Sequence, residues 1–528
     1  KSRFEGGLQG KRKNNQAVSE TGCNNNIRLE DHTRTKLMPA LKEIVYKVSL
    51  KSVSGNMDMD ISGVYIDSRK VQEGGLFVAM VGTETDGHKF IDKAIENGAT
   101  AILGHYMPAY LRPGVTYITT ADTSEALGLV AGNFFDNPSG KLKLVGITGT
   151  NGKTSTATLL FQLFKDLGYP VGLISTVNNR INDRVLPAAL TTPDAITINE
   201  LLSKMVAEGC TYCFMEASSH AIDQKRIKGL QFSGAVFTNI SHDHLDYHGS
   251  FENYITAKKK LFDDLPADAF ALVNIDDKRG LIMLQNTKAR QVTYGIKRIA
   301  DFKGKIISNT LRGLELEIDQ EQVWFKLIGE FNAYNLVAAY GVAMLLGEEG
   351  QEVLRQLSNM GPAPGRFDQV TTGSGVTAIV DYAHTPDALE KVLSTIKAFR
   401  TGQEQLITVV GCGGNRDKQK RPIMAGIACK YSDKVVLTSD NPRDEAPEQI
   451  LEDMQQGINA AYLKKVLTIV DRKEAIKTAC ALSANQDIIL VAGKGHETYQ
   501  EIKGKRHDFD DKVVLTEMME LVKGGAED

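Results

Sequence analysis

The sequence has few cysteines and no long apolar run. Its 528 residues include six scattered cysteines. This usage is typical of a reducing compartment, so we expect a cytoplasmic protein without structural disulfides. No apolar segment approaches the length of a membrane-spanning helix, which predicts no membrane insertion. The formal net charge of −3 gives no electrostatic reason to expect a nucleic acid partner.

A structural zinc site is also poorly supported. Cys210 and Cys213 form a C-x-x-C pair, but no second pair follows at zinc spacing. The surrounding "CTYCFMEAS" is typical of a strand. Both cysteines are therefore interpreted as buried apolar residues.

The length and composition predict a globular protein of about three domains. Hydrophobic content of 42% and charged content of 24% are ordinary for that class. The first 37 residues are polar and Asn-rich without periodicity, which indicates a disordered extension or an expression artefact. Pro- and Gly-rich boundaries at 136–140 and 361–368 divide the rest. The predicted units are 38–139, 140–362 and 363–528.

Alternating strand and helix patterns predict an α/β fold. In the first unit, strands are expected at 63–71, 74–82 and 100–104, with a helix at 88–99. The central unit is expected to form a mainly parallel sheet with helices on both faces. The third unit resumes the alternation as a second, Rossmann-like α/β sheet. Ligands of such sheets gather beyond the carboxyl ends of the strands, so the residues following each strand matter most.

The segment "GITGTNGKTSTAT" at 146–158 lies between a predicted strand and a predicted helix. Apolar residues recur at helical spacing after the loop, and Gly168 ends the pattern. In a strand–turn–helix, backbone N–H groups and a helix N-terminus converge and favour an anion. Lys153 adds a charge for outer phosphates, and Thr154 a hydroxyl for Mg2+. The alternative is a Gly-rich turn that binds nothing.

This loop does not obey the strict spacing of a phosphate-binding loop. The G-x-x-x-x-G-K-[ST] pattern needs a glycine at position 147, which is Ile147. The glycines stand at Gly146, Gly149 and Gly152 instead. The loop therefore predicts a nucleoside triphosphate but belongs to a different branch of such loops.

Polar residues cluster after two later strands. Glu216 to His220 follow one strand, and 239–249 hold three histidines with Asp243 and Asp246. Such a cluster suits zinc, acid–base chemistry or Mg2+ beside phosphates. Without a thiolate partner or an H-E-x-x-H helix, Mg2+ with Glu216 as ligand is favoured. The alternative is a polar loop satisfied by its own hydrogen bonds.

Five stretches in this order resemble the Mur ligase family, which comprises ATP-dependent amide-forming enzymes of peptidoglycan precursor synthesis. They are "GTNGKTS" (149–155), "TTPD" (191–194), "EASSH" (216–220), "NISHDHLDYHG" (239–249) and "GEFNAYNLVAA" (329–339). The family loop has the form G-T-N-G-K-[ST], which accounts for the unusual spacing. The resemblance covers roughly residues 45–525.

Three C-terminal stretches resemble the branch of the family that adds meso-diaminopimelate to UDP-MurNAc-L-Ala-D-Glu. They are "GCGGNRDKQKRP" (411–422), "DNPR" (440–443) and "GKGHETYQ" (493–500). The resemblance implies ATP and Mg2+ as cofactors and a monomer. The alternatives are the lysine-adding branch, a folylpolyglutamate-type ligase and, from another class, a non-catalytic scaffold.

The resemblance implies the reactive residues. Lys153, Asn151, His244 and Lys258 are expected to be catalytic, with Lys258 carbamylated; an unmodified lysine is the alternative. The implied metal ligands are Thr154, Glu216, His244 and carbamylated Lys258. The implied ATP-binding residues are Gly149, Thr150, Asn151, Gly152, Lys153, Thr154, Ser155, Asn332, Asn335, Arg366 and Asp381. His384 is expected to support this cleft.

The resemblance also implies two sets of substrate-binding residues. Those for the UDP substrate are Ile66, Ser68, Thr83, Glu84, Thr85, Thr191, Thr192, Ser218, Gln224 and Arg226. Those for diaminopimelate are Arg416, Asp440, Asn441, Pro442, Arg443, Gly493 and Glu497. For each hydroxyl, ordinary capping or turn bonding is the alternative.

Diaminopimelate and lysine differ by one distal carboxylate. Arg443 offers a planar fork suited to that carboxylate. Lysine is expected to leave Arg443 unpaired, and losing such a pair costs about 2–5 kcal/mol. Arg443 therefore predicts a preference for diaminopimelate.

Overall fold

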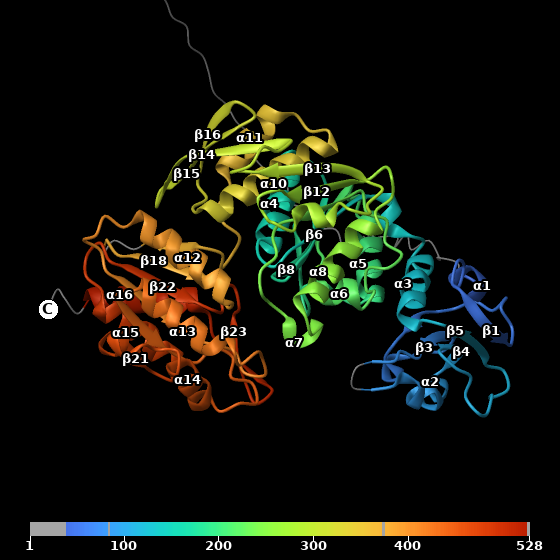
Figure 1. Cartoon of the computed structure of the whole chain (residues 1–528). Coiled ribbons are helices and arrows are strands. Elements are labelled where there is room, and N and C mark those ends of the chain that lie inside the picture. The colour runs from blue at the N-terminus through green and yellow to red at the C-terminus, as the bar shows by residue number, and fades with distance from the viewer. Residues whose placement is uncertain (1–37, 83–84, 372–374, 525–528) are drawn as a thin grey trace, which may run out of the picture. The chain divides into compact units, whose positions relative to one another are not determined.

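The computed structural model describes residues 38–82, 85–371 and 375–524, and Figure 1 labels its elements. The interpretation of residues 1–37 lies outside this part. The described residues from Pro39 onward belong to one compact unit. None of the described helices is long and apolar enough to cross a membrane. The predicted α/β class with three sheet-containing units is confirmed.

The first unit contains a five-stranded sheet in the order β1-β5-β4-β3-β2. Only the β1–β5 pair is antiparallel. The strands are β1 (Leu50–Ser54), β2 (Val64–Tyr65), β3 (Gly75–Val78), β4 (Ala99–Gly104) and β5 (Thr116–Thr120). The helices are α1 (Leu41–Ile44), α2 (Ile91–Glu96) and α3 (Thr123–Phe134).

The central unit contains an eleven-stranded sheet in the order β16-β15-β14-β13-β12-β11-β6-β10-β7-β8-β9. Its strands are β6 (Lys143–Thr148), β7 (Val171–Ile174), β8 (Asn178–Ile181), β9 (Arg184–Pro187), β10 (Tyr212–Glu216), β11 (Gly234–Phe237), β12 (Phe270–Asn274), β13 (Arg290–Gly295), β14 (Phe302–Thr310), β15 (Gly313–Ile318) and β16 (Glu321–Phe325). Its helices are α4 (Lys153–Asp166), α5 (Ala195–Ala207), α6 (Ser219–Asp223), α7 (Leu245–His248), α8 (Phe251–Asp263), α9 (Gly280–Met283), α10 (Glu330–Leu346) and α11 (Gly350–Asn359).

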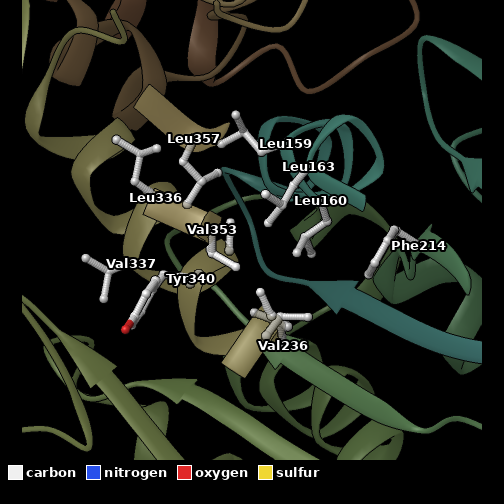
Figure 2. Packing of buried hydrophobic residues seen from close by; sticks show 14 of the residues in the cluster. Leu159, Leu160, Leu163, Phe214, Val236, Leu336, Val337, Tyr340, Val353 and Leu357 are labelled. Carbon is white, nitrogen blue, oxygen red and sulfur yellow. The ribbon is translucent and has the colours of Figure 1, made fainter. Parts of the chain in front are cut away.

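Alternation along β6 explains the two helical layers of the central sheet. Val145 and Ile147 pack with α4, α10 and α11, whereas Leu144 packs with α5 and α8 on the other face. Figure 2 shows the first of these cores, in which Leu160 and Leu163 of α4 meet Leu336 of α10 and side chains of α11. Each such fully buried side chain stabilises the fold by about 1.5–3 kcal/mol. This packing fixes the N-terminus of α4, which carries the Gly-rich loop.

The C-terminal unit contains a six-stranded sheet in the order β17-β18-β22-β19-β20-β21, parallel except for β17. Its strands are β17 (Asp368–Thr371), β18 (Thr377–Asp381), β19 (Leu406–Val410), β20 (Lys434–Leu437), β21 (Val466–Thr468) and β22 (Ile488–Ala492). Its helices are α12 (Pro386–Phe399), α13 (Lys420–Tyr431), α14 (Pro447–Gln455), α15 (Arg472–Leu482) and α16 (Asp511–Gly524). A separate hairpin, β23 (Tyr499–Ile502) and β24 (Lys505–Asp508), follows β22.

Several local expectations are wrong. The strand expected at 63–71 is limited to β2, because Asp67 caps a 3-10 turn at Ser68–Lys70. The helix expected at 88–99 is shorter, since Gly87–Phe90 forms a 3-10 turn before α2. The expectation of a mainly parallel central sheet is confirmed, since the described strand pairs from β7 through β14 are all parallel and antiparallel pairs occur only at its two ends. The prediction that Cys210 and Cys213 are buried is confirmed.

Candidate functional site

The Gly-rich loop between β6 and α4 depends on two glycines with left-handed backbone. Gly149 has φ 151° and Gly152 has φ 87°. A Cβ at Gly149 would lie 1.9 Å from Thr238 Oγ1, and one at Gly152 would lie 2.8 Å from Asn335 Oδ1. These positions admit only glycine because neighbouring polar groups press against the backbone. The loop therefore keeps its N–H groups clear of side chains, as anion binding requires.

The end of β11 braces this loop, which the sequence analysis did not foresee. The backbone N–H of Thr150 donates to Asn239 O at 2.8 Å, and that of Asn151 donates to Asn239 Oδ1 at 3.0 Å. Thr238 Oγ1 donates to Asn151 O at 2.6 Å. The sequence did offer a signal for Thr238 and Asn239, because both residues come directly after a predicted strand. Thr238 and Asn239 fix the loop without themselves needing to touch a ligand.

Lys153 begins α4 and folds back over its own loop. Its Nζ donates to Gly149 O and Thr150 O, each at 2.9 Å. Burial lowers the pKa of this ammonium, while Glu216 and Asp243 favour its charged form. The lysine thus stands where a phosphate cradled by the loop would meet a cation.

Thr154 and Glu216 form a second polar pair at the loop. Thr154 Oγ1 donates to Glu216 Oε2 at 3.0 Å, and the Thr176 N–H donates to Glu216 Oε1 at 2.7 Å. Both side chains are buried. Arg366, from the start of the C-terminal unit, reaches Thr154 Oγ1 with its Nη2 at 3.2 Å. The pair offers hard oxygen ligands beside a phosphate loop.

Among the described residues, no three His, Cys, Asp or Glu side chains cluster closely enough to hold a metal ion. Mg2+ commonly takes one or two protein oxygens and completes its shell with water and substrate phosphates. Thr154 and Glu216 fit that incomplete donor set. The donor set does not fit a closed structural metal site.

His244 and Lys258 occupy different environments. His244 begins α7 with φ 53°, and its side chain is 43% exposed. Lys258, in α8, is buried, and its Nζ donates to Gly149 O at 2.9 Å. Burial, reinforced by the Lys153 cation, lowers the pKa of Lys258 well below 10.5. Two lysines therefore share one carbonyl beneath the phosphate loop.

A main cavity of about 840 Å3 joins the central and C-terminal units. It brings together the phosphate loop, Glu216 at the end of β10, polar residues after β11, and the loops of the C-terminal sheet. The predicted site residues that line it are Thr150, Asn151, Gly152, Lys153, Thr154, Ser155, Thr191, Glu216, His244, Arg366, Arg416, Asp440, Asn441, Arg443, Gly493 and Glu497. The predicted residues Gly149, Lys258 and Pro442 are not part of its lining.

A second cavity of about 410 Å3 opens from the same loop. Asn151, Gly152, Ser155 and Arg366 line both cavities, and Asn335 and Asp381 line the second. Asn332 supports Asn335 through a 3.0 Å bond from Asn335 Nδ2 to Asn332 Oδ1.

The Asp381 carboxylate accepts from the N–H groups of Phe367 and Ala383 at 2.6 and 2.8 Å. Burial raises the pKa of this carboxyl to about 6. Each carboxylate oxygen therefore accepts one hydrogen bond from the backbone. Through Phe367, Asp381 also fixes the segment with which the C-terminal unit begins.

Asp387, at the start of α12, links the C-terminal unit to the phosphate loop. Its Oδ2 accepts from Asn151 Nδ2 at 2.7 Å, Ser241 Oγ at 2.9 Å and Lys391 Nζ at 2.8 Å. No local sequence signal marks this role, because the two partners from the central unit, Asn151 and Ser241, lie more than 140 positions away. The contact brings the N-terminal end of α12 against Asn151, a residue expected to bind phosphate.

The residues predicted for the UDP substrate fall into two groups. Thr192 organises one group: its hydroxyl donates to Glu216 O at 2.8 Å and accepts from Ser218 N, while its carbonyl accepts from Arg226 Nη1 at 3.0 Å. Arg226 also holds Gln224 Oε1. The other group, Ile66, Ser68 and Thr85, lies in the first unit outside the main cavity lining. Thr83 and Glu84 lie outside the described residues.

The loops after β20 and β22 interlock in the residues predicted for the amino acid. Asn441 Nδ2 donates to Glu497 Oε2 at 2.7 Å. Lys494, which was not predicted, is buried and donates to Asn441 Oδ1 and to Glu497 Oε2, each at 3.1 Å. Burial raises the pKa of Glu497. Because both donors use Oε2, the other oxygen of Glu497 remains available to the cavity.

His384 lines the main cavity and gives a pH-dependent expectation. Burial, helped by the Lys420 cation, lowers the pKa of its imidazole from 6.5 to about 4. Between these values the unfolded chain binds a proton that the folded chain does not, so stability falls as the pH drops below 6.5, by up to ~1.4 kcal/mol per pH unit. Between pH 6.5 and pH 4.5, we expect the calorimetric transition temperature to fall less in His384→Gln than in the wild type. An equal loss in both proteins would contradict this assignment.

Comparison with known families and proteins agrees with this geometry. Residues 60–135 match "Mur ligase family, catalytic domain", residues 147–343 match "Mur ligase middle domain", and residues 365–495 match "Mur ligase, glutamate ligase domain". Each match covers most of the strands of one of the three sheets.

Two relatives and two solved structures resemble the chain over nearly their full lengths. The UDP-N-acetylmuramoyl-L-alanyl-D-glutamate–2,6-diaminopimelate ligases of Cytophaga hutchinsonii and Bacteroides fragilis are 57% and 55% identical to it, each over 91% of this chain and 99% of its own length. A solved structure with the same name is 32% identical, with a TM-score of 0.65 over 92% of this chain and 99% of its own. A MurF ligase from Thermotoga maritima in complex with ADP is 19% identical, with a TM-score of 0.58 over 88% and 98%, and supports the fold alone.

Proposed function

The chain belongs to the Mur ligase family, and from this premise we propose that it joins meso-2,6-diaminopimelate to UDP-MurNAc-L-Ala-D-Glu in an ATP-dependent reaction. It is a ligase that forms an amide bond between an acid and an amino acid. Its product is a peptidoglycan precursor, so its activity serves cell wall biogenesis and, through it, cell shape and division. The free state of the described cysteines supports a cytoplasmic enzyme, and we expect a monomer.

The observation that carries this proposal is the composition of the main cavity. It is lined by the phosphate loop with Lys153, by Thr191 and Glu216, and by the Arg443 loop. An amide-forming ligase must hold a triphosphate, a carboxylate and an amine within reach of one another. One continuous cavity with these three kinds of lining supports that requirement.

The reaction proceeds through an acyl phosphate. An oxygen of the D-glutamyl carboxylate forms a bond to the γ-phosphorus of ATP, and the bond from that phosphorus to ADP breaks. The diaminopimelate amine then attacks the acyl carbon, loses a proton, and the carbon–oxygen bond to phosphate breaks. The first step brings two anions together, so it needs cations at the point of contact.

The chain's own residues supply that positive charge. Loop N–H groups and Lys153 are assigned to the β- and γ-phosphates, and Asn151 assists them. Arg366 is assigned to the γ-phosphate because it already reaches Thr154 from the C-terminal unit. Asn335 and Asp381 line the second cavity, which supports their assignment to the nucleoside. Asp387 would release Asn151 to the phosphate as the nucleotide enters.

Thr154 and Glu216 would hold Mg2+, which when bound neutralises phosphate oxygens. Their 3.0 Å separation and their burial support this assignment. Because Glu216 also accepts from Thr176 N, its carboxylate is held in one orientation before a metal arrives.

Carbamylation of Lys258 would resolve an electrostatic conflict. Lys258 and Lys153 both donate to Gly149 O, and both amines are buried. The lowered pKa of Lys258 favours the neutral amine, which is the form that reacts with carbon dioxide. A carbamate there would turn a repulsive neighbour of Lys153 into an attractive one and, with His244, could orient a second Mg2+.

Arg443 is assigned to the distal carboxylate of diaminopimelate, and its replacement gives a specificity test. Because Arg443 has φ 52°, Arg443→Asn removes the charge with less backbone strain than alanine would. We expect the KM for diaminopimelate to rise at least about tenfold. This rise corresponds to part of the about 2–5 kcal/mol that truncating one partner of a charge pair typically costs. The KM for ATP should stay within about twofold, since the described contacts of Arg443 are with Gly414, Asn441 and the β23–β24 hairpin and not with the phosphate loop.

The control for this variant is Arg355→Asn, which removes an exposed arginine paired only with Glu352 on α11. Steady-state kinetics with each substrate varied in turn provide the measurement. If Arg443→Asn kept the full preference for diaminopimelate over lysine, the assignment of Arg443 would be wrong.

Substrate-dependent phosphate release tests the proposed function itself. We expect inorganic phosphate in stoichiometric yield only when ATP, UDP-MurNAc-L-Ala-D-Glu and diaminopimelate are all present. A scaffold protein would release none, and a simple ATPase would release phosphate without the other two.

A further inference from the structure

The β23–β24 hairpin is fastened to the loop that carries Arg443. Arg443 N–H donates to Glu501 O at 3.0 Å, and Lys503 N–H donates to Arg443 O at 2.7 Å. Glu501 N–H donates to Asn441 Oδ1 at 2.9 Å. These bonds form an isolated bridge between Arg443 and Ile502. The position of Glu501 relative to Arg443 is therefore set by backbone rather than by a flexible side chain.

The side chains of these two residues also face each other. Glu501 Oε2 lies 3.6 Å from Arg443 Nε, and the side chains are 27% and 21% exposed. This distance is too long for a hydrogen bond but short for opposite charges. Arg443 is oriented instead by carbonyls, since its Nη1 donates to Gly414 O at 2.9 Å and lies 3.5 Å from Asn441 O. Glu501 therefore affects Arg443 mainly through its negative charge, while the carbonyl groups orient the guanidinium.

This contact corrects the expectation that lysine leaves Arg443 unpaired. With lysine in the site, Glu501 still balances part of the guanidinium charge. Diaminopimelate brings a second carboxylate to a cation that already has one. Compared with an arginine that has no carboxylate partner, Arg443 therefore weakens lysine binding less and strengthens diaminopimelate binding less.

We propose that Glu501 is a specificity-determining residue, a resident carboxylate that shares Arg443 with the distal carboxylate of the incoming amino acid and limits discrimination against lysine. This inference rests on the proposed function. Glu501 is not among the residues that line the main cavity, so its charge acts on the substrate through the guanidinium of Arg443, which does line it.

The surrounding charges do not cancel this effect. Asp440 and Glu497 also line the cavity and would attract the distal ammonium that both amino acids share. Arg416 lines the cavity as well, but its Nη1 is bound to Asn415 O. Asp440 and Glu497 therefore act on both substrates alike, whereas Arg443 with Glu501 acts on the carboxylate in which the two substrates differ.

The expected effect follows from the interaction of partly solvated charges. Solvent screens charges near a protein surface, so the interaction between the Glu501 carboxylate and the Arg443 guanidinium is modest. We therefore expect Glu501→Gln to raise the ratio of kcat/KM for diaminopimelate to that for lysine roughly threefold to tenfold. The KM for diaminopimelate should fall, and the difference from wild type should shrink as ionic strength rises.

The experiment compares wild type, Glu501→Gln, Glu501→Leu and Asp508→Asn with both amino acids. Asp508 is an exposed carboxylate on the same hairpin, so its variant makes the same change in net charge. Both Glu501 variants keep the backbone bonds to Arg443, and the leucine variant serves if the amide fails to fold. We expect a raised ratio in the Glu501 variants and none in Asp508→Asn.

An unchanged or lowered ratio in a folded Glu501 variant would overturn the proposal, as would an equal rise in Asp508→Asn. If the wild-type protein joined no diaminopimelate at all, the proposed function would fail, and the inference with it. If the wild type joined diaminopimelate but the ratio did not respond, only the role of Glu501 would be wrong.

Discussion

Replacement of Lys153 by methionine is expected to lower the rate of product formation by at least about 10²- to 10³-fold, the usual effect of removing one preorganised electrostatic group from a transition state. Methionine keeps the apolar stem but loses the ammonium that Gly149 O and Thr150 O hold over the loop. The loop conformation itself depends on Gly149, Gly152 and the β11 brace. The fold should therefore survive.

The control for this prediction lies on the same helix. Lys165 pairs with Asp183 near the end of α4, far along the helix from the loop, and Lys165→Met should retain full activity. The rate is measured by chromatography of the nucleotide-linked product, and the transition temperature of each variant checks the fold. A Lys153→Met enzyme that worked at near wild-type speed would show that the phosphate loop is not used in catalysis.

Replacement of Lys258 by alanine is expected to lower the rate by about 10²-fold or more, because it removes an anionic group that would orient a cation beside the phosphates. Native mass spectrometry of the intact wild type under carbon dioxide should show an increment of one carbon dioxide that is absent from Lys258→Ala. A small carboxylate added to Lys258→Ala should restore part of the rate, since it can replace the missing anion.

The two lysines that follow Lys258 in the sequence test whether position 258 is the modified one. Lys259 pairs with Asp263 along α8, and Lys260 pairs with Asp223 on the surface. Neither points beneath the phosphate loop, so Lys260→Ala should keep full activity. If Lys258→Ala were fully active, or if Lys259 carried the modification instead, the assignment would be wrong.

The parts of the fold that follow from local pattern could be predicted from the sequence. The strand before Gly149 and the helix from Lys153 have strong, uninterrupted signals, and Glu216 at the end of β10 and Asp440 and Asn441 after β20 lie at the cavity. Their position depends only on the rule that polar residues follow parallel strands at the sheet's carboxyl edge.

The hairpins were missed because their strands are polar and short. Asn182 with φ 52° turns β8 into β9, and Lys503 with Gly504, both at positive φ, turns β23 into β24. Neither Asn-Asp nor Lys-Gly is one of the dipeptides, such as Asn-Gly or Asp-Gly, that predict a two-residue hairpin turn. The flanking strands gave no alternating apolar pattern either, since β9 and β24 are largely exposed.

The long-range partners could not be predicted at all. Asp387 reaches Asn151, and Lys494 reaches Asn441, through contacts that only the packed sheets create. Glu501 lies in the missed hairpin, so its pairing with Arg443 was missed as well. In the sequence alone, a charged residue on a short polar strand is interpreted as solvent-exposed. Only the structure shows that the strand lies beside another loop.

Mass spectrometry of the product formed in a competition tests the central claim most directly. The purified protein is given ATP, UDP-MurNAc-L-Ala-D-Glu and equal amounts of diaminopimelate and lysine. We predict one dominant product carrying diaminopimelate, with one ADP and one phosphate released for each molecule formed. A dominant lysine product, or product without ADP, would contradict the account.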